Sequence, residues 1–136
     1  MNRSQTRELA FKLLYQIEIQ KEVTQEDVEI FFESNDVNSK QAQEYIKDIV
    51  FGIEEVSSEI TSIISNNLKD NWEIERVSKV NLSLLKLAIY EIKYKELPYK
   101  VVINEVVELA KKYGEETSHS FVNGILANVG RLRRAI

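Results

Sequence analysis

The spacing of its apolar residues constrains this chain more than any other feature, because almost all of the chain repeats at the period of an α-helix. One proline and four glycines interrupt the pattern. No stretch alternates apolar and polar residues between turns, as a half-buried strand does. With 136 residues, the chain is long enough to bury a core. The sequence therefore predicts one all-α domain.

The first helices have recognisable starts. An amphipathic helix is expected over residues 4–21, and Thr24, followed three residues later by Asp27, predicts the N-cap of a short second helix. Over residues 42–63 the apolar residues are spaced alternately four and three apart, which is a heptad seam. Gly52 interrupts this seam, so packing inside a helical bundle is favoured over a free coiled coil.

Capping and turn residues separate the remaining helices. Ser39 is a candidate cap for the seam segment, and Asp70-Asn71 predict the turn after it. A central helix over residues 77–92 is apolar on nearly all sides. Gly114 is expected to end the next helix in the left-handed conformation.

The last helix is expected to begin at Ser118, as its cap, and to carry an apolar stripe through Leu132. Gly124 lies inside this helix. Because a glycine has no side chain, Gly124 is expected to permit the close approach of another helix.

Charge is distributed unevenly along the chain, which has a net charge of −4. Residues 1–22 and 76–136 carry net charges of +1 and +5, whereas residues 23–75 hold three lysines against thirteen acids. If the two basic ends fold together, one face becomes locally positive on an acidic protein. The alternative, which charge alone leaves equally open, is a well-solvated acidic hairpin in the middle.

Several classes of protein are excluded by what the sequence lacks. Without cysteine there is no disulfide scaffold, which suits a reducing compartment, and the single histidine, His119, leaves little material for metal or nucleophilic catalysis. No apolar run approaches the roughly 20 residues that span a bilayer, and no phosphate-binding glycine loop occurs. We therefore expect a non-enzymatic, cytoplasmic protein without cofactor or metal.

One ridge of the first helix has the composition of an RNA contact. Arg3, Arg7, Phe11 and Tyr15 are each four residues apart and so lie along one side of the helix. Guanidinium groups bind phosphates, and aromatic rings stack on unpaired bases. In the plainer alternative, which the residues alone favour, both rings belong to the core and both arginines are ordinary solvated charges.

The carboxy-terminal part carries a specific series of motifs: Leu87-Ala88-Ile89-Tyr90-Glu91, residues 98–111, Tyr113-Gly114 and residues 118–126. Weaker motifs precede them: Arg7-Glu8-Leu9-Ala10, Leu14-Tyr15-Gln16, Trp72 and Arg76. Together they resemble the NusB family of bacterial transcription antitermination factors. The resemblance covers the whole chain and is weakest over residues 23–70.

The resemblance implies an all-α fold of about seven helices in two packed bundles, here over residues 1–70 and 71–136. It also implies a role without catalysis. Proteins of the family bind the boxA element of ribosomal RNA leader transcripts jointly with NusE, a ribosomal small-subunit protein, and help to assemble an antitermination complex on RNA polymerase.

The resemblance also implies two surfaces. The RNA surface lies at the starts of the first and last helices, here at Arg3, Arg7, Tyr15, Thr117, Ser118, Ser120 and Phe121. The first and last helices are therefore expected to pack side by side. The partner surface lies on the central helix and its neighbours, here at Arg76, Asn81, Glu91 and Tyr99.

The chain departs from the family pattern where charge matters. Its first helix opens with only two arginines, and Asn81, Thr117 and Ser120 stand where relatives often carry charged residues. We therefore expect weak binding of RNA alone, more dependence on NusE, and a shallow salt dependence. Two alternatives stay open: an RNA-recognition module that works with a separate RNA-modifying enzyme, and a homodimer formed through the seam over 42–63.

Overall fold

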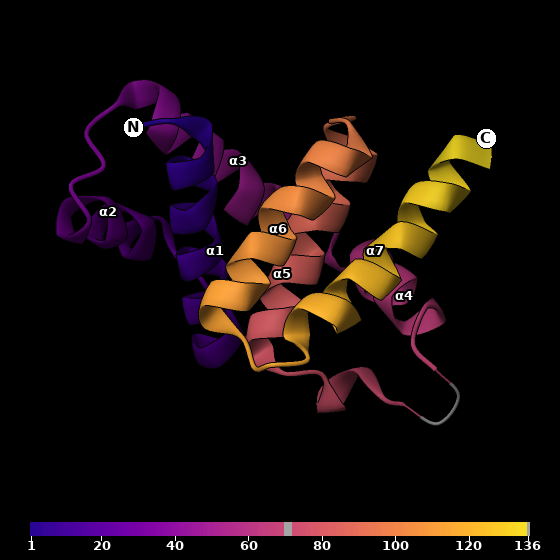
Figure 1. Ribbon diagram of the computed structural model, residues 1–136. Helices are drawn as coiled ribbons and strands as arrows, with labels where there is room; N and C mark the ends of the chain where they lie inside the picture. The colour runs from indigo at the N-terminus through magenta and orange to yellow at the C-terminus, as the bar shows by residue number, and fades with distance from the viewer. Residues whose placement is uncertain (70–71, 136) are drawn as a thin grey trace.

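A computed structural model describes residues 1–69 and 72–135 of the chain, with side chains through Gly130. This part contains seven α-helices and no strand, so the all-α prediction is confirmed (Figure 1). The helices are α1 (Arg3–Gln20), α2 (Gln25–Ser34), α3 (Lys40–Glu55), α4 (Ser57–Asn66), α5 (Lys79–Ile89), α6 (Tyr99–Tyr113) and α7 (Ser118–Ala135). A 3₁₀ turn, η1 (Ile74–Arg76), precedes α5, and a π-helical turn, η2 (Tyr90–Tyr94), continues it. The turn expected at Asp70-Asn71 and the side chain of Leu132 lie outside the described residues.

Side-chain caps account for where the first helices begin. Thr24 Oγ1 accepts a hydrogen bond from the Asp27 amide at 3.1 Å, and the Thr24 amide donates to Asp27 Oδ2 at 2.9 Å, so the predicted capping box is confirmed. Asn2 and Gln5 form the same reciprocal pair at the start of α1. Ser39 caps α3 as predicted.

The heptad seam over 42–63 does not form one helix. Val56, at φ −110° and ψ 24°, separates α3 from α4. The seam residues Ile46, Ile49 and Ile60 are nevertheless fully buried within the chain, which confirms packing inside a bundle. Because these side chains are already covered, the seam offers no exposed stripe for a second copy.

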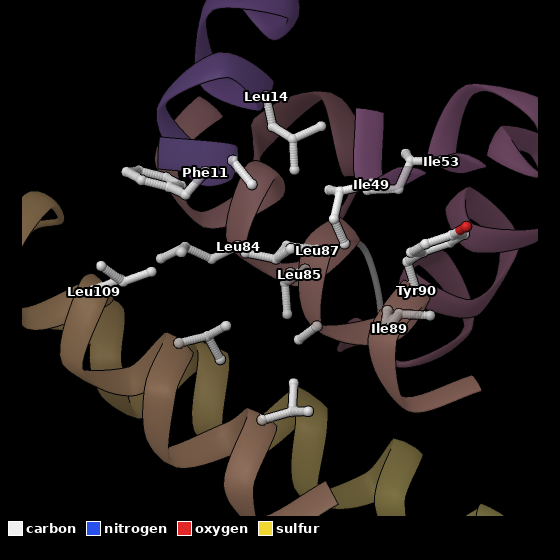
Figure 2. Close-up of a cluster of buried hydrophobic side chains, with 14 of the residues drawn as sticks. Phe11, Leu14, Ile49, Ile53, Leu84, Leu85, Leu87, Ile89, Tyr90 and Leu109 are labelled. Carbon is white, nitrogen blue, oxygen red and sulfur yellow. The ribbon is translucent and has the colours of Figure 1, made fainter. Parts of the chain in front are cut away.

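The central helix α5 contacts the amino-terminal helices α1, α3 and α4 as well as α6 and α7, so all of them share one core. Leu84, Leu85 and Leu87 are completely buried, and Figure 2 shows them in one cluster with Phe11 of α1, Ile49 of α3 and Leu109 of α6. Helix α5 packs against α1 on one side and against α6 and α7 on the other (Figure 1). This arrangement explains why α5 is apolar on nearly all sides. No helix in the described part of the chain is long and apolar enough to cross a membrane.

Two predictions about glycines are wrong. Gly114 ends α6 as predicted, but its φ of −92° is not left-handed; a Cβ there would collide with the Ser118 side chain, so the position needs a small residue for steric reasons. No helix approaches Gly124, because nothing lies within 4 Å of a Cβ built on it. The close approach occurs further along α7, at Gly130, where a Cβ would come within 2.7 Å of the Tyr99 ring.

Candidate nucleic-acid interface

Helix α6 lies between α1 and α7, so the expectation that the first and last helices pack side by side is wrong (Figure 1). On its α1 side, α6 presents polar and aromatic groups. Lys112 Nζ lies 2.7 Å from Glu8 Oε2, the Tyr113 hydroxyl also donates to Glu8, and the Tyr113 and Phe11 ring centroids are 5.2 Å apart. On its other side, α6 packs against α7. One helix thus separates the two expected halves of the RNA surface.

Arg7 is buried rather than presented at the surface. It is 3 % exposed, and its Nε and Nη2 donate to the two carboxylate oxygens of Glu91 at 2.7 and 3.1 Å. Its Nη1 donates to Glu105 Oε1 at 2.9 Å. Tyr45 completes the cluster by donating its hydroxyl hydrogen to Glu91 Oε2 at 2.9 Å. A fork-like guanidinium held by two carboxylates is a strong and geometrically specific contact.

The electrostatics of this cluster keep Arg7 charged. Burial by itself opposes the charge, but the hydrogen bond and the negative charge of Glu91 outweigh burial and raise the pKa of Arg7 above its ordinary value. The pKa of Tyr45 is also raised, by burial and then by the charge of Glu91. Within this conformation Arg7 and Glu91 bind each other, and neither side chain is presented to RNA or to a partner.

The remaining residues of the α1 ridge divide between core and surface. Phe11 is buried, Arg3 is exposed, and Tyr15 is 36 % exposed. The Arg3 guanidinium lies 4.1 Å from the centroid of the Tyr45 ring, a cation–π contact. Because α1 rises 1.5 Å per residue, Arg3 and Tyr15 are about 18 Å apart along its axis.

The start of α7 presents part of the expected set. Thr117 and Ser120 are exposed, and Phe121 is half-buried. Ser118 is 2 % exposed, and its Oγ accepts a hydrogen bond from the Glu115 amide at 2.9 Å. Ser118 therefore shapes the turn into α7, and its hydroxyl is not at the surface.

An open groove of about 580 Å³ runs along this end of α7. Trp72, which is 52 % exposed, lies with its ring centroid 6.4 Å from that of Phe121 at an interplanar angle of 36°. The lining residues are Asn67, Leu68, Lys69, Trp72, Thr117, Ser120, Phe121, Gly124, Ile125 and Asn128. Rings, hydroxyls and amides together can stack on a nucleobase and hydrogen-bond its edge. Reasoning from the sequence missed this groove, although a lone tryptophan in a polar stretch was a signal for it.

The four expected partner residues are not brought together. Arg76 is exposed in η1, and Asn81, in the first turn of α5, is half-buried. Glu91 is buried in η2, about 15 Å further along the same axis, and the half-buried Tyr99 packs on Gly130. The set therefore covers both ends of the α5–η2 segment.

Five lysines of the basic carboxy-terminal segment, residues 76–136, are paired with acids in the part of the chain that the structure describes. Lys95 Nζ lies 3.1 Å from Asp48 Oδ2 of the acidic segment. Further ion pairs join Lys86 with Glu18, Lys93 with Glu59, Lys111 with Glu108 and Lys112 with Glu8. These pairs neutralise part of the positive charge expected from the two basic ends.

The comparisons with known proteins agree on one family. The NusB family model matches residues 4–131. Transcription antitermination protein NusB of Acetivibrio thermocellus is 44% identical over 134 residues, covering 98% of this chain and 91% of the relative. The NusB of Clostridium acetobutylicum is 45% identical over 130 residues, covering 95% of each chain.

Solved structures extend this similarity to three dimensions. The T. maritima NusB structure has a TM-score of 0.86 at 34% identity, covering 96% of this chain and 92% of that chain. A crystal structure of antitermination factors NusB and NusE in complex with double-stranded RNA contains a chain with a TM-score of 0.87 at 30% identity, covering 96% of each chain.

Proposed function

Because this chain belongs to the NusB family of transcription antitermination proteins, we propose that it binds boxA-containing single-stranded RNA together with NusE and helps to assemble the antitermination complex on RNA polymerase. In this proposal the protein acts as an adaptor and performs no catalysis. The NusB solved with NusE and RNA supports binding to both kinds of partner.

The observation that carries the proposal for this chain is the aromatic groove at the start of α7. Exposed Trp72 and half-buried Phe121 offer ring faces, and the hydroxyls of Thr117 and Ser120 lie at the same groove. Three of these four residues belong to the RNA surface that the family resemblance implies. A groove of this composition suits unpaired bases, whose faces are accessible for stacking.

Arg7 and Ser118, the two buried residues of the expected RNA surface, hold other RNA-binding residues in position in this proposal. Arg7 ties α1 to η2 and α6, and so holds Arg3 and Tyr15 in place on the exposed side of α1. Ser118 similarly fixes the turn that carries Thr117 and Ser120. The proposed direct RNA contacts are therefore Arg3, Tyr15, Thr117, Ser120 and Phe121.

The proposed NusE contacts are the accessible members of the partner set: Arg76, Asn81 and Tyr99. Glu91 contributes by holding Arg7. Since Arg76 and Asn81 are at one end of α5 and Tyr99 beyond the other, the partner would have to extend along α5.

A band-shift titration with boxA RNA and a scrambled RNA, each with and without NusE, tests the proposal. We expect the wild type to prefer boxA RNA and to bind it more tightly with NusE. Phe121→Ala should lower the affinity about tenfold, since stacking on one ring contributes roughly 1–3 kcal/mol per base.

The matched control is Ile30→Ala, which truncates an exposed apolar side chain on α2, away from the groove. It should bind boxA RNA like the wild type. Equal affinity of the wild type for boxA and scrambled RNA, or an unchanged affinity of Phe121→Ala, contradicts the proposal.

A further inference from the structure

Gly124 is the glycine for which the fold supplies no reason. It lies inside α7, with no positive φ, and a Cβ at this position would meet nothing within 4 Å. A Cβ at Gly52, Gly114 or Gly130 would instead collide with a neighbouring side chain. A glycine in a helix interior is less stable than alanine, so Gly124 lowers the stability of α7 without any packing in return.

The open space at Gly124 is the middle of the groove. Thr117, Phe121, Gly124 and Asn128 are spaced four, three and four residues apart, so they form one stripe along α7. A longer side chain at the third of these positions would extend into the groove that Phe121 also lines. The missing side chain therefore leaves open a part of the groove that the two aromatic rings also line.

The composition of the groove favours a base over a phosphate. Among the described residues that line it, Lys69 is the one charged side chain, so this part of the lining holds no cluster of cations for a phosphate. The walls instead offer the flat faces of Trp72 and Phe121, with the Asn128 amide further along the stripe. An aromatic face with amide and hydroxyl groups around it matches the face and edge of an unpaired nucleobase.

We propose that Gly124 is a specificity-determining residue that leaves room for one unpaired nucleobase, stacked on the Trp72–Phe121 pair. This inference rests on the proposed function, since it takes RNA as the ligand, and adds to it a single-base pocket and the residue that keeps the pocket open. A base inside a duplex is excluded from the pocket because its faces are already stacked on the neighbouring base pairs.

The test compares Gly124→Leu and Gly124→Ala with the matched variants Asn123→Leu and Asn123→Ala. Asn123 is exposed on the same turn of α7 and does not line the groove. Both alanine variants should unfold at a higher temperature than the wild type, because alanine favours a helix over glycine or asparagine. Leucine also favours a helix over both residues, so both leucine variants should unfold no lower than the wild type. The unfolding temperatures of all four variants thus distinguish a loss of binding from a loss of folding.

The binding readout uses boxA RNA in the presence of NusE together with the fluorescence of Trp72, the single tryptophan of the chain. RNA should quench Trp72 in the wild type and in both Asn123 variants. Gly124→Leu should abolish the quenching and weaken RNA binding about tenfold, and Gly124→Ala should have a smaller effect in the same direction.

A second experiment locates the base. RNAs that carry one abasic nucleotide at successive positions are titrated against the wild type and Gly124→Leu. One position should exist at which removing the base weakens binding to the wild type about tenfold and scarcely affects Gly124→Leu.

The outcomes separate this inference from the proposed function. A wild type that binds no RNA, with or without NusE, overturns the proposed function and the pocket with it. A wild type that binds RNA while Gly124→Leu binds it equally well overturns only the pocket. If Gly124→Leu loses NusE binding and keeps RNA binding, the groove is a protein-docking site, which also overturns the pocket.

Discussion

At the scale of single residues, the Arg7–Glu91 pair shows how much burial changes the role of a side chain. Both side chains are almost inaccessible, with relative exposures of 4% and 1%. Removing one partner of a buried ion pair leaves an uncompensated charge in a poorly hydrated site. Arg3, four residues earlier on the same ridge, is exposed, and its charge is solvated. Two arginines on one ridge therefore have different roles.

Glu91→Ala should reduce the free energy of unfolding by about 3–5 kcal/mol, because it leaves the Arg7 guanidinium buried with only Glu105 as a partner. Urea denaturation followed by circular dichroism measures this change. Arg3→Ala is the control and should cost at most about 1 kcal/mol, the strength of an exposed cation–π contact. A Glu91→Ala protein as stable as the wild type would show that Arg7 is not buried in solution.

At the scale of elements, the contact of α3 with η2 depends on the absence of a side chain at Gly52. The Tyr90 ring lies across Gly52, where a Cβ would overlap its hydroxyl end. Tyr90 cannot swing away freely, because it is 6% exposed and its hydroxyl donates to Asp48 Oδ1 at 2.9 Å. Burial and Asp48 also raise the pKa of Tyr90 to about 12, so the hydroxyl keeps its hydrogen at neutral pH.

Gly52→Ala should therefore destabilise the protein by about 1–3 kcal/mol, the usual cost of overpacking a core, although alanine favours a helix. Tyr90→Phe in the same background removes the atom nearest to the new methyl group. The double variant should then be less destabilised than the sum of the two single variants, as measured by urea denaturation. Strict additivity would argue against the contact.

At the scale of the whole molecule, folding brings together charges that the sequence keeps apart. Two acids of the middle segment form ion pairs with lysines of the carboxy-terminal segment: Asp48 with Lys95, and Glu59 with Lys93. Among the described residues near the proposed RNA surface, Arg3, Lys12 and Lys69 are cations without a carboxylate within ion-pair distance. The described part of the proposed RNA surface therefore offers few charges to phosphates.

RNA binding should consequently depend weakly on salt. With about three phosphates neutralised, the logarithm of the association constant should fall with the logarithm of the salt concentration at a slope of roughly −2. Titrations of boxA RNA at several salt concentrations, with NusE present, measure this slope for the wild type and for Lys69→Ala. Lys69→Ala should make it shallower by somewhat less than 1. A much steeper slope would mean that the protein contacts the RNA backbone far more extensively.

The local structure of this protein could be derived from its sequence. The helical period, the capping box at Thr24 and Asp27, and the cap at Ser39 are short-range features, and the structure confirms them. Such features depend on residues three or four positions apart, whose geometry in a helix is nearly fixed. The same spacing also placed Arg3, Arg7, Phe11 and Tyr15 along one side of α1.

What that spacing left undecided is the direction in which this side of α1 faces. The hydrophobic effect is not directional, so many different packings of the same helices would bury the apolar faces that the sequence pattern predicts. Tertiary contacts placed α6 between α1 and α7, turned Arg7 inward onto Glu91, and set Trp72 beside Phe121 across 49 positions of sequence. The sequence by itself therefore determined the helices and their apolar faces. Only the tertiary structure decided which polar side chains stay at the surface, because that depends on which helix covers which face.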